Sequence, residues 1–138
     1  MDPGEATGIP LITVSLMVGL CAQVELLVSD ADTASALGSG DVPVLATPRV
    51  VALCEEATLR ALAPELRAGQ TSVGFRVEIT HLVPVSVGSS VVASASLERV
   101  EGKRLVFSVT VNDKCGLVAA GRVTRVLVDL ETFLEKAR

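Results

Sequence analysis

The hydrophobic pattern first predicts a strand at residues 20–29, LCAQVELLVS. Polar Gln23 and Glu25 alternate there with apolar residues that share one face of an extended chain, namely Ala22, Val24, Leu26 and Val28. The residues that follow, 30–40, are mostly small or polar, with DAD and GSG clusters. We interpret them as a connection with room for one short helical turn.

A helix is predicted to begin at Thr47. The apolar residues after it recur at helical spacing; they are Val50, Val51, Cys54, Thr58, Ala61 and Leu62. Thr47 is a candidate N-cap, and Pro48 suits the first helical position because its missing N–H costs nothing there. Pro64 and Gly69 end the pattern. We expect one helix of about 16 residues, apolar on more than one side and therefore buried in the concave face of a sheet.

After the helix the period changes to two, which predicts four strands, at residues 72–83, 88–100, 103–112 and 117–130. The connections between them are short, so we expect consecutive strands to pair antiparallel. The fold class is then α+β, with one long central helix wrapped by a five- or six-stranded antiparallel sheet.

Residues 1–17 are interpreted as an N-terminal extension to a single domain at 18–138. Within the extension, residues 9–16 are an extra edge strand or a partner-binding segment. The apolar stretch that begins there is too short to cross a bilayer. The acidic residues before it, Asp2 and Glu5, do not fit a secretory leader. We therefore expect no membrane partner.

Composition narrows the function classes. The chain has 138 residues, a net charge of −4, three Phe and neither Tyr nor Trp, which argues against a nucleic-acid partner. Cys21, Cys54 and Cys115 form no C-x-x-C pair, so we interpret them as reduced thiols of a cytoplasmic protein. A single histidine excludes a histidine-rich metal centre, and no metal is expected.

Several polar residues coincide with the predicted core. His81 shares the apolar parity of strand 72–83 and is expected to point at the helix, either as a core histidine held by one hydrogen bond or as a functional group. Glu55 lies beside the apolar stripe of the helix, as a rim carboxylate or as a partner of His81; such pairs cluster at functional sites. Cys54 could act as a nucleophile with His81, although cysteines are commonly just buried. Gly74 could do no more than tolerate a β-bulge.

Three stretches carry a more specific combination of motifs: PVLATPRVVALCEEA at 43–57, SVGFRVEITHLVPVSVGSSVVASASLERVEGKRLVFSVTVND at 72–113, and GRVTRVLVDLETF at 121–133. The most specific elements are A-T followed eight residues later by Glu, an S-x-G turn into a strand ending in T-H, and a V-E-G-[KR]-[RK]-L hairpin. Together they resemble the hot-dog-fold thioesterases of the fluoroacetyl-CoA thioesterase type, over about residues 18–135.

The resemblance implies a homodimer that binds acyl-CoA at the dimer interface. It leaves open whether dimers pair further. It implies that the catalytic residues are Thr47, Glu55 and His81. The backbone amide of Gly74 would face the thioester carbonyl, and Arg125 on the last strand would be a neighbour of the substrate. No cofactor is implied beyond the CoA of the substrate.

The chemistry of thioester hydrolysis fits these residue types. Glu55 could attack the thioester to form an anhydride or act as a general base toward water, with His81 orienting it and protonating the leaving group. Gly74 would supply an oxyanion donor, and Thr47 would bond the carboxylate or the thioester. In one straight helix, however, Thr47 and Glu55 lie about 12 Å apart along the axis. They can share a site only if the chain around Thr47 folds back or if they come from opposite subunits.

The substrate expectation follows from residues 37–46, LGSGDVPVLA, where fluoroacetyl-specific relatives carry gating phenylalanines and this chain has no aromatic residue. We therefore expect hydrolysis of short or medium acyl-CoA thioesters without specificity for fluoroacetyl. The alternative is a non-catalytic hot-dog module that binds acyl-CoA or a protein partner. A dehydratase or hydratase is disfavoured by the placement of His81 on a strand.

Overall fold

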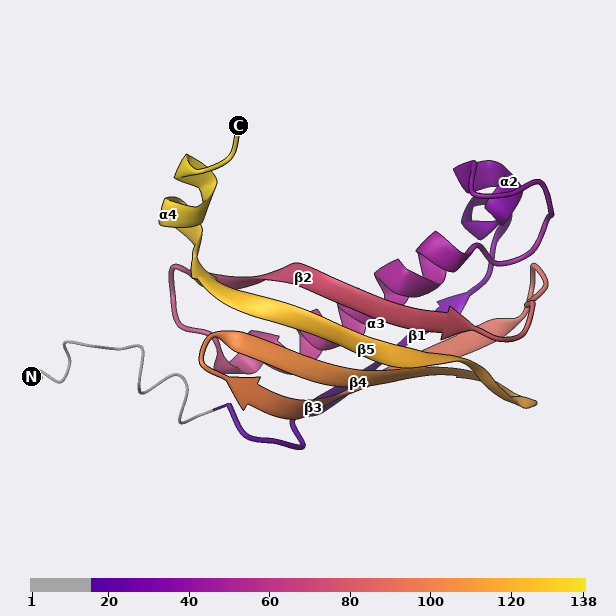
Figure 1. The fold of residues 1–138 in the computed structure, drawn as a ribbon. Helices are drawn as coiled ribbons and strands as arrows, with labels where there is room; N and C mark the ends of the chain where they lie inside the picture. The colour runs from indigo at the N-terminus through magenta and orange to yellow at the C-terminus, as the bar shows by residue number, and fades with distance from the viewer. Residues whose placement is uncertain (1–15) are drawn as a thin grey trace, which may run out of the picture.

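The computed structural model describes residues 16–138 and consists of one antiparallel sheet lying along a long helix (Figure 1). The sheet order is β1-β3-β4-β5-β2. The strands are β1 (Cys21–Leu27), β2 (Gln70–His81), β3 (Ser90–Glu101), β4 (Arg104–Asp113) and β5 (Gly116–Asp129). Every neighbouring pair is antiparallel. This confirms the α+β class and the arrangement that the resemblance implies.

The helices include the predicted central helix and the predicted short turn in the connection before it. They are η2 (Asp30–Asp32), α2 (Ala34–Leu37), α3 (Thr47–Leu62), η3 (Ala63–Glu65) and α4 (Leu130–Glu135). The short η2 and α2 fill the predicted connection and lie beside the beginning of α3, whereas α4 extends from the opposite end of the sheet (Figure 1). The start and the end of each of the five strands fall within two residues of those that the hydrophobic period predicts.

The core lies between α3 and the inner face of the sheet. Its helical side consists of Val50, Leu53, Cys54, Ala57, Ala61 and Leu62, all buried. The sheet supplies mostly small aliphatic residues together with Phe107, the largest side chain that is fully buried. Removing this apolar surface from water is the main force that holds helix and sheet together.

The order of the strands departs from one expectation. Consecutive strands were expected to pair, but β2 and β3 do not; β2 lies beside β5 at one edge of the sheet. The connection 82–89 is not a tight turn, because it pairs with the segment that precedes α3: Leu45 N–H donates to Val85 O (2.9 Å), and Val44 forms a bridge with Ser86. Held in this way, the chain passes the beginning of α3 and enters the other half of the sheet.

A β-bulge in β2 overturns part of the predicted side-chain parity. The register against β5 shifts between Gly74 and Arg76, so one extra residue is inserted there. Before the bulge, the buried Ser72 faces inward. After the bulge, the half-buried His81 faces inward as well, toward Thr47. Phe75, predicted to face the helix, is 56% exposed on the outer face, where the Arg104 guanidinium lies 4.5 Å from the centre of its ring.

At the N-terminal end, the predicted segment 9–16 lies outside the described residues except for Leu16, which is buried against the core. Within residues 16–138, no helix is both long and apolar enough to span a membrane.

The two phenylalanines give a direct test of this arrangement. Phe107→Ala should lower the free energy of unfolding by about 3–5 kcal/mol, because it opens a cavity in the core. Phe75→Ala removes the same atoms from the outer face and should cost about 1 kcal/mol or less, mostly through the lost contact with Arg104. Urea denaturation followed by circular dichroism measures both. Equal losses for the two variants would contradict the assigned bulge.

Candidate active site

The first group of polar residues joins the beginning of α3 to the end of β2. Thr47 Oγ1 and His81 Nδ1 lie 2.8 Å apart. Thr47 was expected to be the N-cap, but Ala46 occupies that position with an extended backbone (φ −74°, ψ 141°), and Thr47 is the first residue of α3. Its hydroxyl is therefore free to bond the imidazole. The other ring nitrogen, Nε2, is buried and has no hydrogen-bond partner among the described residues. One hydrogen bond to His81 is what both interpretations of this residue expect, the core histidine and the functional group, so the functional interpretation stays a prediction.

The second group lies further along the helix, where Glu55 meets strands β2 and β5. Arg125 Nη1 donates to Glu55 Oε2 at 3.4 Å. The Arg125 side chain is 7% exposed and that of Glu55 is 33% exposed, so the guanidinium is held inside and the carboxylate reaches the surface. Arg125 is held by Ser72 as well: its Nε donates to Ser72 Oγ (2.8 Å) and its Nη2 to Ser72 O (3.0 Å). Ser72 was not singled out from the sequence, where only its place in the S-x-G motif could have drawn attention to it.

Gly74 completes this group by leaving space for the carboxylate. A Cβ atom at Gly74 would lie 2.6 Å from Glu55 Oε2 and 3.9 Å from Arg125 Nη1. Any side chain there would push the Glu55 carboxylate aside. Gly74 also borders the bulge in β2, which confirms that this glycine accompanies a bulge, and its missing side chain allows the close approach of Glu55. The predicted contact of its amide with a thioester carbonyl stays a prediction.

Burial affects the pKa of Arg125 in this group. Burial lowers the pKa of Arg125, and the neighbouring Glu55 carboxylate acts in the opposite direction. A guanidinium stays protonated in proteins, so Arg125 is a buried positive charge that requires Glu55 as its counter-ion. Glu55 is thus fixed in direction although a third of its side chain is exposed.

The cysteine alternative is contradicted by the surroundings of Cys54. Its side chain is buried in the core, and burial, with a smaller contribution from the charge of Glu55, raises the pKa of the thiol to about 11. The reactive form of a cysteine is the thiolate. Cys54 therefore stays protonated near neutral pH and contributes packing only.

The two groups are not brought together within one chain. The structure joins Thr47 to His81 and Glu55 to Gly74 and Arg125, but no hydrogen bond links the two sets among residues 16–138. Both Thr47 and Glu55 belong to α3, which separates them by about 12 Å along its axis. The chain does not fold back before the helix, so that route to a shared site is excluded.

A cavity of about 320 Å³ opens beside Thr47 and His81. Its wall comes from the segment before α3 and from the connection after β2. It is mainly aliphatic, and its larger apolar side chains are Val42, Val44, Leu45, Leu82, Val83 and Pro84. No aromatic side chain other than the imidazole lines it. The Thr47–His81 pair thus faces a space suited to a small apolar group.

Comparison with known proteins identifies the family. Residues 28–131 match the family described as fluoroacetyl-CoA-specific thioesterase. The chain belongs to this family of thioester hydrolases. It is 37% identical over 95 residues to the fluoroacetyl-CoA thioesterase of Streptantibioticus cattleyicolor, a match that covers 69% of this chain and 68% of that one.

Solved structures agree with this assignment. A structure of the fluoroacetyl-CoA thioesterase superposes with a TM-score of 0.83 at 30% identity, covering 88% of this chain and 95% of that one. A thioesterase superfamily member from Thermus thermophilus superposes with a TM-score of 0.80 at 29% identity, covering 86% and 88% of the two chains. A hot-dog-like protein from Thermanaerovibrio acidaminovorans gives the same TM-score and coverage at 28% identity. The hot-dog fold and the thioesterase family expected from the sequence motifs are thereby confirmed.

The environments of the thiols predict their reactivity. Cys21 and Cys115 are exposed, whereas Cys54 is buried with a pKa of about 11. At pH 8 an aromatic disulfide reagent should modify the two exposed thiols rapidly in the native protein. It should reach the third only after denaturation, because the folded-state pKa lies above the assay pH and the side chain is enclosed. Rapid release of three equivalents from the native protein would contradict the assigned burial of Cys54.

Proposed function

We propose that this protein hydrolyses short or medium acyl-CoA thioesters without preference for fluoroacetyl, in active sites completed by two subunits. The main observation in support is that a Thr47–His81 pair opens onto an aliphatic cavity, while Glu55 is oriented by Arg125 beside the bare backbone of Gly74. A module that only binds acyl-CoA has no need of Thr47, Glu55, Gly74 and His81 together.

Thioester hydrolysis gives a step to Glu55, to His81 and to Gly74. In the general-base route, Glu55 accepts a proton from water while the resulting hydroxide adds to the thioester carbonyl. In the nucleophilic route, the Glu55 carboxylate adds directly, an anhydride forms as the C–S bond breaks, and water then hydrolyses the anhydride. In both routes the departing CoA thiolate takes a proton, for which His81 is the available donor. We assign stabilisation of the oxyanion to the Gly74 amide, as the family resemblance implies.

Dimerisation through β2 would bring the two groups together. β2 is a 12-residue edge strand, and half of its residues are exposed. Long open edges tend to be paired in native proteins. An antiparallel pairing of β2 with its copy across a two-fold axis sets His81, at the end of one strand, opposite the beginning of the other. That beginning carries Ser72 and Gly74 of the partner subunit, next to its Glu55.

Substrate range follows from the cavity. Its wall before α3 contains only small and aliphatic side chains, so no bulky or aromatic side chain forms a gate there that would limit the acyl group or select fluorine. We infer that acetyl and fluoroacetyl groups are handled alike and that short or branched aliphatic chains fill the space better.

Turnover tests the proposed function. Release of free CoA thiol should be measured with acetyl-, fluoroacetyl-, isobutyryl-, hexanoyl- and benzoyl-CoA. Glu55→Gln keeps the volume of the side chain and removes its charge, so kcat should fall by about 100-fold or more. Glu56→Gln is the matched control, because Glu56 is the next residue of α3 and its side chain is paired with Arg60 at the surface. No thiol release from the wild-type protein with any substrate would favour the non-catalytic module instead, and a thousandfold preference for fluoroacetyl over acetyl would refute the inferred range.

Mixed dimers test the shared site. If Glu55 of one subunit serves Thr47 and His81 of the other, a dimer of one Glu55→Gln chain and one His81→Ala chain holds one intact site and one doubly altered site. Random mixing makes half of the dimers mixed, so the mixture should regain about a quarter of wild-type activity, although each variant alone has about 1% or less. Light scattering checks that the proteins are dimeric. A dimeric mixture with no regain of activity would contradict sharing between subunits.

A further inference from the structure

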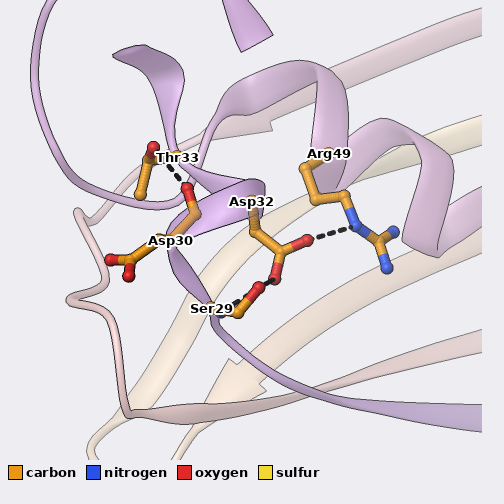
Figure 2. A network of polar contacts seen from close by, with 5 residues as sticks. All are labelled: Ser29, Asp30, Asp32, Thr33 and Arg49. Atoms are coloured by element: carbon orange, nitrogen blue, oxygen red, sulfur yellow. Dashed lines mark hydrogen bonds and ion pairs between the residues drawn. The ribbon is translucent and has the colours of Figure 1, made fainter. Parts of the chain in front are cut away.

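A further set of polar contacts, separate from the two groups described above, joins the short helix η2 to the first turn of α3. Asp32, at the end of η2, is only 9% exposed, yet three donors reach its carboxylate (Figure 2). Oδ2 accepts from Ser29 N–H (2.8 Å) and from Ser29 Oγ (2.9 Å), and Oδ1 accepts from Arg49 Nε (2.9 Å). Chiefly because of the Ser29 N–H, the pKa of Asp32 is lowered from its usual value, which favours the ionised carboxylate that Arg49 pairs with.

This ion pair differs from the surface pairs of the protein in its burial. The side chains of Arg49 and Asp32 are 27% and 12% exposed, whereas those of Arg60 and Glu56, on the same helix, are 60% and 41% exposed. Exposed pairs contribute little because water screens them and the side chains move freely. A partly buried pair whose carboxylate accepts three hydrogen bonds fixes the position of its partners more firmly.

The pair connects two parts of the chain that border the cavity. Arg49 is the third residue of α3, two positions after Thr47. Asp32 begins the segment that runs back along the chain leading into α3. Its carbonyl accepts from Ala46 N–H (2.9 Å), Ala34 N–H donates to Val44 O (2.9 Å), and Ser35 N–H donates to Val42 O (3.1 Å). Ala34, Ser39 and Gly40 of this segment line the cavity.

We propose that the Asp32–Arg49 pair is a specificity-determining clamp that holds the 32–46 segment against the first turn of α3 and so sets the depth of the acyl cavity beside Thr47 and His81. The proposal rests on the proposed function, because it assigns the cavity to the acyl group. Neither residue touches the reacting atoms; both act by positioning the wall.

The clamp has a consequence for substrate length. With the pair intact, the wall is fixed and the cavity of about 320 Å³ stays small enough to enclose a short chain. Without it, the remaining backbone bonds of the 32–46 segment can open together, and the wall can move outward. Long chains then enter more easily, whereas short chains lose contacts. Because the altered contacts are made equally in the ground and transition states, the change should appear in KM more than in kcat.

The clamp can be tested without turnover by binding of CoA thioethers, which cannot be hydrolysed. The dissociation constants of S-butyl-CoA and S-decyl-CoA should be measured by calorimetry for the wild type, Asp32→Asn and Arg49→Gln. We expect the ratio of butyl to decyl affinity to fall by about 10-fold in both variants, which is in the range that a few methylene contacts supply. Arg60→Gln, which breaks the exposed pair on the same helix, is the matched control and should leave the ratio unchanged.

Two further measurements separate the clamp from a general loss of stability. Hydrogen exchange at the amides of Ala34, Ser35 and Ala46 should accelerate in the variants, whereas exchange in β4 should not. Arg49→Lys keeps the charge, so its ratio of butyl to decyl affinity should lie between those of Arg49→Gln and the wild type. An equal loss of affinity for both thioethers, or an unchanged ratio, would overturn the proposal, as would absence of thioether binding by the wild type. Normal thioether selectivity together with no turnover would instead overturn the proposed hydrolysis and leave the clamp supported.

Discussion

Two sets of groups on β2 must face α3, and an unbroken strand could present only one of them. Ser72 and Gly74 occupy even positions and His81 an odd one, and alternate residues of a strand point to opposite faces. The bulge after Gly74 adds one residue, so that both ends of the strand face the helix. Phe75 is turned to the outer face as a result. The room for the Glu55 carboxylate at one end of β2 and the contact with Thr47 at the other both depend on this single change of register.

The helix imposes the complementary constraint. Thr47 and Glu55 are fixed on one rigid element, so no rotation of side chains can bring them to the same thioester. Glu55 is in turn tied to Arg125, whose buried charge would be strongly destabilising without a counter-ion. The same carboxylate therefore balances a charge in the fold and, in the proposed function, takes part in the chemistry. The proposed completion of the site from another subunit would leave both constraints intact.

The parts of the structure that could be predicted are those that local pattern determines. The helix at Thr47 and the strand boundaries follow from periodicity, because burial repeats at each element's own period. The residues of the candidate site came from motifs, and the structure brings Thr47 to His81 and Glu55 to Gly74. What could not be predicted depends on partners distant in the chain: the position of β2 beside β5, the outward turn of Phe75, and the roles of Ser72 and the Asp32–Arg49 pair. Nothing in a local stretch of sequence records which distant donor a buried serine or aspartate will meet.

The buried polar groups of the protein differ in how many hydrogen bonds the fold gives them. Asp32 receives three hydrogen bonds and Arg125 donates to both Ser72 and Glu55, so these charges are fixed. Fully bonded buried networks of this kind make a structure rigid. His81 Nε2, by contrast, is buried without a partner among the described residues. A nitrogen in that state is destabilising unless a substrate, a water molecule or a neighbouring subunit bonds it. The fold itself therefore fixes the charges of Asp32 and Arg125, whereas the described residues supply the imidazole of His81 with one hydrogen bond, the one shared with Thr47.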